Sequence, residues 1–155
     1  MILDVCCGSQ MFYFDKNRKD LITMDIRQEN FSIHGKKIDV NPSVVVDFRD
    51  IPFENETFHH VIFDPPHLIH PGKNSIMFCQ YGGLSKETWQ KDIKKGFEEC
   101  WRVLKNNGTL IFKWSEHDIR VKQILEICPL SPVYGHKRGK TVWLVFIKNE
   151  EMEKC

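Results

Sequence analysis

The sequence predicts an α/β fold in which a doubly wound, mostly parallel sheet closes with an antiparallel hairpin. Short apolar runs that end beside an acid alternate with amphipathic helical segments, as buried parallel strands alternate with crossover helices. The turn-rich segment 133–140, followed by the apolar run 141–148, predicts the closing hairpin. A chain of 155 residues is long enough for one hydrophobic core and too short for two, so we expect a single domain over residues 1–155.

Four apolar runs in the first half of the chain predict strands over residues 1–6, 21–26, 44–48 and 60–63. Each run ends in or beside an acid, and these acids are Asp4, Asp25, Asp47 and Asp64. The carboxyl ends of neighbouring parallel strands meet at one edge of a sheet. We therefore expect the four carboxylates to gather around one site.

The second half of the chain begins with a predicted helix that Ser85 can cap and that Asn107-Gly108 can end. Its apolar side chains recur every three or four residues, at Trp89, Ile93, Phe97, Cys100, Trp101 and Leu104. A fifth strand over 109–114 and a short helix over 118–128, stopped by Pro129, are predicted to follow.

The composition limits the classes of partner. The 22 basic and 21 acidic side chains nearly cancel, so nucleic-acid binding would depend on local patches rather than on net charge. Six cysteines without C-x-x-C spacing, and no signal peptide or long apolar span, predict a reduced cytoplasmic protein without disulfides, a metal site or a membrane segment. The charged clusters 16–19 and 34–37 are interpreted as solvated surface.

The most informative segment is Phe-Asp-Pro-Pro-His at residues 63–67. It follows a predicted strand, and its two prolines make it rigid because proline fixes φ and has no N–H group. The Asp64 carboxylate and the Pro65 carbonyl can therefore face one ligand as paired acceptors. Such a pair suits an amine that has two hydrogens to donate.

Asp64-Pro65-Pro66-His67 resembles the (D/N/S)-P-P-(Y/F/W) motif, known as DPPY, of the amino-methyltransferases, a branch of the class I S-adenosylmethionine-dependent methyltransferases. Residues 3–9 resemble a reduced form of the glycine loop of that class. The resemblance implies a Rossmann-like methyltransferase fold in a minimal form, without the helix that usually precedes the first strand and without a target-recognition domain. It also implies that these four residues are catalytic, with His67 in the place of the aromatic residue that stacks on the target base.

The loop after the first predicted strand favours S-adenosylmethionine as the cofactor. A dinucleotide site requires a G-x-G-x-x-G loop, because the backbone must approach a pyrophosphate. Residues 6–10 contain one glycine, Gly8, which is enough for a methyl donor without phosphate. Asp4 would favour the positive charges of that donor. Asp25, 17 positions after Gly8, could accept hydrogen bonds from two ribose hydroxyls.

The resemblance implies further contacts around the adenine of the cofactor. Asp47 would accept a hydrogen bond from the adenine amine, and Phe48 and Ile26 would line the adenine. Cys6 would lie under the cofactor as a small packing residue, together with Cys7. A role of these cysteines as nucleophiles, as in cytosine-C5 methylation, requires a thiolate beside the target base and is not favoured.

The expected reaction is methylation of an exocyclic amine, and the resemblance points to adenine N6 in DNA or RNA. The long segment 68–84 could close over a substrate, with Phe78 or Tyr81 stacked on a base. His67 could stack on the base or carry a proton away. The basic turn with His136, Lys137 and Arg138 could contact phosphates, although a charged turn is equally explained by solubility.

Three other functions stay open. The paired acceptors also fit a cytosine or guanine amine or a side-chain amide. A non-catalytic cofactor-binding subunit, acting with a partner or as a homo-oligomer, is consistent with the histidine at position 67. An NAD-dependent oxidoreductase is opposed by the single glycine of the loop.

Overall fold

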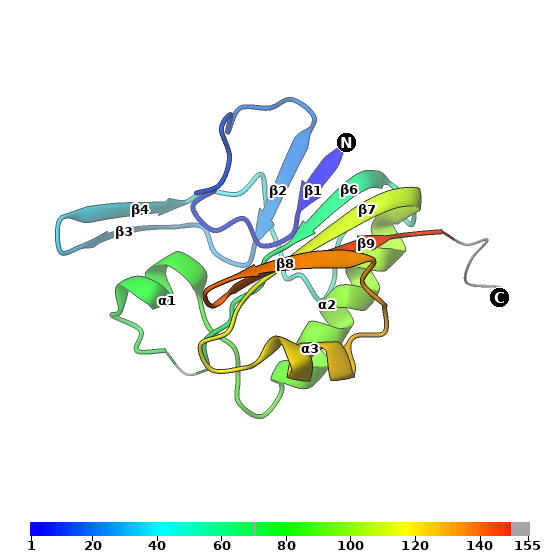
Figure 1. The fold of residues 1–155 in the computed structure, drawn as a ribbon. Helices are drawn as coiled ribbons and strands as arrows, with labels where there is room; N and C mark the ends of the chain where they lie inside the picture. Colours follow the sequence, from blue (N-terminus) through cyan, green and yellow to red (C-terminus); the bar gives the residue numbers. More distant parts are fainter. Residues whose placement is uncertain (70, 150–155) are drawn as a thin grey trace.

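The computed structural model describes residues 1–69 and 71–149, in which seven strands form one sheet. In spatial order these strands are β5 (Val44–Val45), β2 (Leu21–Asp25), β1 (Ile2–Asp4), β6 (Phe58–Phe63), β7 (Leu104–Ser115), β9 (Thr141–Ile147) and β8 (Tyr134–Arg138). The first five pair in parallel, and β9 runs antiparallel to both of its neighbours. The predicted doubly wound sheet and its closing hairpin are therefore confirmed (Figure 1).

Two helices, α2 (Trp89–Val103) and α3 (Val121–Ile127), pack against each other beside the sheet. The fully buried Phe97 of α2 lies 5.3 Å from Phe63 and 4.8 Å from Phe112, measured between ring centroids. Each such side chain contributes about 1.5 to 3 kcal/mol by its burial. The connections 5–20 and 26–43 contain no helix. No helix in the described part of the chain is long and apolar enough to cross a membrane.

Both ends of α2 differ from the expectation. The helix begins at Trp89 after Thr88, and Ser85 does not cap it, because the Ser85 hydroxyl donates to Glu87 while its carbonyl accepts from the Trp89 N–H group. At the other end, α2 stops at Val103 and β7 begins directly at Leu104.

Asn107-Gly108 therefore lies inside β7 rather than at a helix end. Asn107 has a φ of 63°, and the register with β6 shifts here, so that the pair forms an irregularity of the strand. A Cβ atom on Gly108 would lie 2.7 Å from the Lys105 carbonyl and 2.9 Å from the His59 carbonyl. Glycine is required at this point because two backbone segments approach each other closely. An Asn-Gly pair is also typical of a helix end, so the sequence pattern suggested that the helix stops here.

Two elements were not expected from the sequence. Residues 29–40 form an antiparallel hairpin of β3 (Glu29–Ile33) and β4 (Lys36–Val40), and residues within 68–84 form the helix α1 (Ile76–Tyr81). His34 and Gly35 have φ values of 49° and 76°, the positive values that a two-residue hairpin turn requires. Ile38, Val40 and Cys79 form a small second core between the hairpin and α1. Figure 1 shows both elements at one end of the sheet.

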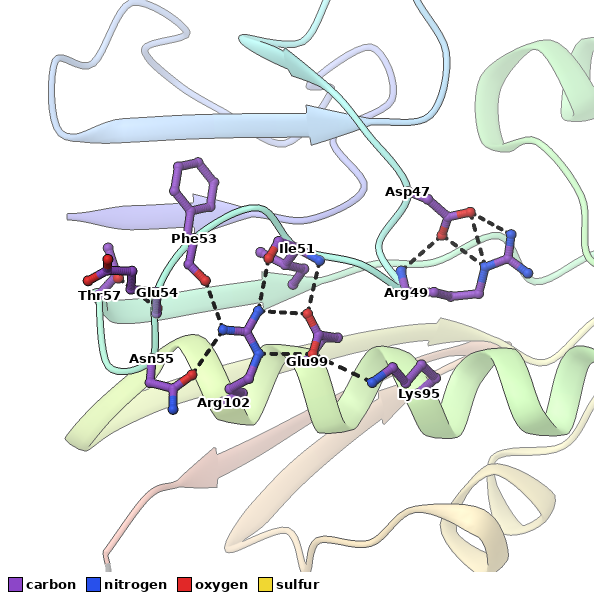
Figure 2. A network of polar contacts seen from close by, with 10 residues as sticks. All are labelled: Asp47, Arg49, Ile51, Phe53, Glu54, Asn55, Thr57, Lys95, Glu99 and Arg102. Atoms are coloured by element: carbon purple, nitrogen blue, oxygen red, sulfur yellow. Dashed lines mark hydrogen bonds and ion pairs between the residues drawn. The ribbon is translucent and has the colours of Figure 1, made fainter.

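A polar network fixes the connection between β5 and β6 onto α2 (Figure 2). Glu99 accepts from the Ile51 N–H group at 2.9 Å and pairs with Arg102 at 2.7 Å. Arg102 donates in turn to the carbonyls of Ile51 and Phe53, both at 2.8 Å. These contacts keep the pKa of the Glu99 carboxyl below its ordinary value, mainly because Arg102 is hydrogen-bonded to it.

We expect Glu99→Ala to lower the free energy of unfolding by about 2 to 3 kcal/mol, because a buried N–H group and a guanidinium lose a charged acceptor. Urea unfolding measures this difference. Lys95→Ala is the matched control, since its half-exposed ammonium lies 3.7 Å from the same carboxylate and should change the stability by less than about 0.5 kcal/mol. Equal effects of the two substitutions would contradict this interpretation.

Candidate functional site

A cavity of about 370 Å³ lies at the carboxyl ends of the central parallel strands. It is formed by the loops that follow β1, β2, β5 and β6, together with α1 and the start of α2. Ten of the residues that were predicted from the sequence line it: Cys6, Gly8, Asp25, Ile26, Asp47, Phe48, Asp64, Pro66, Phe78 and Tyr81. The strand ends therefore gather at one place, as parallel pairing requires.

The first wall of the cavity is the turn at Gly8. This residue has a φ of 49°, and its N–H group donates to Asp25 Oδ2 at 3.0 Å. A Cβ atom would lie 3.1 Å from the Gln80 carbonyl, so the turn also packs closely on α1. The hydrogen bond holds the loop after β1 against the end of β2, at the spacing of 17 residues seen in the sequence.

Arg27, which the sequence analysis did not identify, ties Asp25 to α1. Its backbone N–H group donates to Asp25 Oδ1 at 3.0 Å, and its Nε donates to the same oxygen at 3.2 Å. Its Nη1 donates to the carbonyls of Phe78 and Cys79 at 3.2 and 3.1 Å. Asp25 is thus a buried carboxylate that Gly8 and Arg27 hold in one orientation.

A second arginine organises the outer wall. Arg49 forms a bidentate pair with Asp47 and reaches Asp92 of α2 at 3.0 Å. This pairing lowers the pKa of the Asp47 carboxyl, so Asp47 carries a negative charge at the cavity edge. Both of its oxygens already accept from Arg49, and an adenine amine would have to share them.

Phe48 and Ile26 give the same region an apolar surface. Phe48 packs on Phe63 with ring centroids 5.4 Å apart, and Ile26 is 62% exposed. Gly96 of α2 makes room for the Phe48 ring, because a Cβ atom there would lie 2.5 Å from Phe63 and 2.8 Å from Phe48. Side chains of this kind can pack against the face of a flat ring such as a purine.

The carboxylate of Asp64 meets a lysine that lies 49 residues away in the chain. Lys113 of β7 donates from Nζ to Asp64 Oδ2 at 2.8 Å, and both side chains line the cavity. Burial raises the pKa of Asp64, and the Lys113 charge opposes that rise. One carboxylate oxygen is occupied by Lys113, and Oδ1 accepts no hydrogen bond from another described residue.

Two aromatic rings fix the position of Lys113. Its Nζ lies 5.7 Å from the ring centroid of Phe12 and 5.7 Å from that of Trp143. These distances permit cation–π attraction to both rings. The lysine is only 22% exposed, so its charge is held beside Asp64 rather than in solvent.

Asp4 does not line the cavity and is fully buried. Its Oδ2 accepts from the Tyr13 hydroxyl at 2.8 Å, and its Oδ1 accepts from the Cys6 N–H group at 3.3 Å. Burial raises the pKa of Asp4 to about 7, against the opposing Tyr13 hydrogen bond. The expected influence of Asp4 on a bound cation would therefore act through space.

His67 also lies outside the lining of the cavity, whereas the sequence analysis placed it where a target base stacks. Its ring is 5% exposed, stacks on His117 at 5.5 Å and contacts Tyr81 at 5.0 Å. Its Nε2 has no hydrogen-bond partner among the described residues. Burial lowers the pKa of His67 to about 4, so the ring is neutral at pH 7.

The remaining predicted residues are not among those that line the cavity. Pro65 is buried between Asp64 and Pro66, which both line it. The three candidates on β8, His136, Lys137 and Arg138, are exposed on the edge strand of the sheet. Lys137 forms an ion pair with Glu116, which accounts for its position without a ligand.

The cysteines of the first loop are not poised as nucleophiles. Burial raises the pKa of Cys6 well above its ordinary value and that of Cys7 to about 12. Both thiols therefore stay protonated at neutral pH.

No family model and no curated protein matches the sequence. The structure is similar to that of the PH0226 protein from Pyrococcus horikoshii OT3, with 17% sequence identity, a TM-score of 0.63, and 96% of this chain and 81% of that chain covered. It is also similar to a structure of SAM-dependent methyltransferases from Methanosarcina mazei, with 12% identity, a TM-score of 0.59, and 96% of this chain and 92% of that chain covered.

A third similar structure is the 1,6-didemethyltoxoflavin-N1-methyltransferase of Burkholderia thailandensis with bound 1,6-didemethyltoxoflavin and S-adenosylhomocysteine. Here the identity is 10%, the TM-score is 0.55, and 96% of this chain and 71% of that chain are covered. At such identities the likeness establishes the fold. The chain has the Rossmann-like fold of class I methyltransferases, with the strand order and the closing antiparallel pair described above.

Proposed function

We propose that this protein is an S-adenosylmethionine-dependent N-methyltransferase that acts on an exocyclic amine, with adenine N6 in DNA or RNA as the preferred acceptor. The observation that carries the proposal is the position of Asp64, which lines the same cavity as Gly8 and Asp25. One cavity thus combines a carboxylate that can hold an amine with a loop and an acid that can hold a donor. The similar structures of methyltransferases support this interpretation.

The donor half of the cavity has the chemistry that S-adenosylmethionine requires. Asp25 can accept from a ribose hydroxyl at Oδ2, since a carboxylate has about four acceptor positions and Gly8 and Arg27 use three of them, two of these on Oδ1. Phe48 and Ile26 can hold the adenine between apolar surfaces. Asp47, beside Phe48, can accept from the adenine amine if it shares its oxygens with Arg49. When bound there, S-adenosylmethionine would supply an electrophilic methyl group.

The acceptor half favours attack by a weak nucleophile. The lone pair of a nucleobase amine is delocalised into the ring, so the amine must be oriented before it reacts. Asp64 Oδ1 and the Pro65 carbonyl can accept its two N–H hydrogens and direct the lone pair at the methyl group. Transfer would form the N–C bond and break the C–S bond with its electron pair left on sulfur, and the ammonium product would lose one proton to solvent.

Phe78 and Tyr81 of α1 can stack on the base, and both line the cavity. The low pKa of His67 makes a role as proton acceptor unfavourable. Packing of His67 against Tyr81 would instead hold that stacking surface in place.

We propose a cytoplasmic protein, consistent with the five described cysteines being unpaired.

Incubation of the isolated chain with radioactive donor and mixed nucleic acids tests the proposal. Incorporation of label into N6-methyladenine would support it, and label in a cytosine or guanine amine or in a protein amide would replace adenine by that acceptor. Donor binding without transfer to any acceptor would identify a non-catalytic subunit.

We expect Asp25→Ala to weaken donor binding by about 1.5 to 3 kcal/mol, the usual loss for a hydrogen bond to a charged group. Calorimetric titration with S-adenosylmethionine measures this change. Asp50→Ala, an exposed acid outside the cavity, is the control and should leave the affinity unchanged. Unchanged affinity in folded Asp25→Ala would remove Asp25 from the ribose role.

A further inference from the structure

A second cavity of about 720 Å³ adjoins the donor site. Four residues, Gly8, Ser9, Met11 and Gln80, line both cavities and form the wall between them. The far side of the second cavity is formed by β4 and the residues after it, up to Ser43. A ligand in this groove would therefore lie directly beside the proposed methyl donor.

Basic side chains that are 20 residues apart in the sequence meet in this groove. Lys16 lies on the loop after β1, whereas Lys36 and Lys37 begin β4, and all three line the cavity. Asp39 is its only lining acid among the described residues. The two charged clusters that were interpreted separately as solvated surface thus form one positive groove in a chain of nearly zero net charge.

The positive charge of the groove is available to a ligand. Lys36 and Lys37 are exposed, and neither forms an ion pair with another described residue. Lys16 donates to the Ser9 carbonyl at 3.0 Å, a neutral partner that leaves its charge uncompensated. Thr23, Ser43 and Asn41 also line the cavity. The Thr23 and Ser43 hydroxyls are hydrogen-bonded to each other at 3.1 Å, and Asn41 Oδ1 accepts from Gln28, so the side-chain NH2 group of Asn41 is the donor that can supplement the lysines.

One side of the groove is formed by the β3–β4 hairpin, which packs against α1. Ile38 and Val40 bury one side of β4 against Cys79 of α1, and Lys37 and Asp39 lie on the other side. Lys36 is on the same side as Ile38 but lies at the exposed start of the strand, where it still lines the cavity. The same α1 carries Phe78 and Tyr81 into the donor cavity. Lys36 and Lys37 therefore lie on a hairpin that packs against the helix of the proposed base-stacking side chains. Figure 1 shows the hairpin and α1 at the same end of the sheet.

We propose that this groove binds the phosphate backbone of the nucleic-acid strand whose base enters the donor cavity. The proposal rests on the proposed function and assigns the phosphate contacts to Lys16, Lys36 and Lys37 rather than to β8, where Lys137 is already paired with Glu116. A strand with a flipped or unpaired base can place its neighbouring phosphates along an adjacent groove. Lysine ammonium groups supply the sequence-independent part of such binding.

Fluorescence anisotropy with a single-stranded, adenine-containing oligonucleotide at several salt concentrations tests the proposal. In Lys36→Ala/Lys37→Ala the affinity should fall about tenfold, and the slope of log affinity against log salt should decrease by about 1.4, roughly 0.7 for each single-strand phosphate that a lysine no longer neutralises. Asp39→Asn should have the opposite effect and strengthen binding. Calorimetry should show unchanged S-adenosylmethionine affinity in both variants.

Lys91→Ala/Lys94→Ala removes the same charge from an exposed part of α2 outside both cavities and should leave the salt slope unchanged. Equal effects of the two double substitutions, or no effect of either, would overturn the groove assignment. The proposed function would still stand in that case if the wild-type chain methylates nucleic acid. A wild-type chain that binds the donor but methylates only a protein or a small molecule would overturn the nucleic-acid substrate and the groove together.

Discussion

Asp64→Ala is expected to lower the rate of methyl transfer by about two to three orders of magnitude, as the loss of one preorganised polar group in an active site often does. Donor affinity should stay within a few-fold of the wild type, because Asp25 and the Gly8 loop are untouched. Asp64→Asn should retain more activity, since its amide oxygen can still accept one N–H group. Single-turnover methyl transfer and calorimetry measure the two quantities separately.

The control for this experiment addresses the lysine that Asp64→Ala leaves unpaired. Lys113 is largely buried, so its lone charge could itself destabilise the chain. Asp64→Ala/Lys113→Met removes both charges and should be equally inactive with a more normal stability. Wild-type rates in Asp64→Ala, Asp64→Asn and the double variant would show that Asp64 is not the centre of catalysis.

Lys113→Met is expected to reduce methyl transfer at neutral pH about 10- to 100-fold, the range that corresponds to one charge-assisted hydrogen bond. It should also move the acidic limb of the pH–rate profile to higher pH. The sign follows from the surroundings of Asp64. Burial raises its pKa and the Lys113 charge opposes that rise, so removal of the lysine raises the pKa of Asp64 further. Asp4 lies nearby, but as a carboxylate it cannot replace the positive charge of the lysine. Activity requires ionised Asp64 and is lost as the pH falls through that pKa.

The pH profile distinguishes this role of Lys113 from simple packing. Lys113→Arg keeps the positive charge and should keep the acidic limb near its wild-type position. Lys105→Met changes a lysine on the same strand that does not line the cavity and should leave the profile unchanged. An unshifted limb in Lys113→Met would mean that the lysine does not control the ionisation of Asp64.

Most of the sheet could be predicted from the sequence because its strands are short apolar runs that end at acids. β2 and β9 match their predicted ranges to within one residue, whereas β1 and β5 are shorter than expected and β6 and β7 are longer. The β3–β4 hairpin has a visible signal, because Phe31, Ile33, Ile38 and Val40 alternate with polar residues around a glycine turn. That signal is weak beside the charges of the same segment, and they suggested a solvated surface.

The sequence by itself determined the architecture of the sheet and the gathering of Asp25, Asp47 and Asp64 at one cavity. Both follow from patterns that are local in the chain, since a run of apolar residues sets a strand and parallel pairing brings strand ends together. The glycine of the first loop is likewise recognisable from a few adjacent residues.

Only the tertiary structure decided the partners of these acids. Lys113 reaches Asp64 across 49 residues of sequence, and Arg27 reaches the carbonyl of Cys79 across 52. The burial of His67 beside His117 and the meeting of Lys16 with Lys37 depend in the same way on how distant segments pack. A residue's spacing along the chain fixes the face of the element that it occupies, but its charge partner depends on which side chain the packing brings within hydrogen-bond distance.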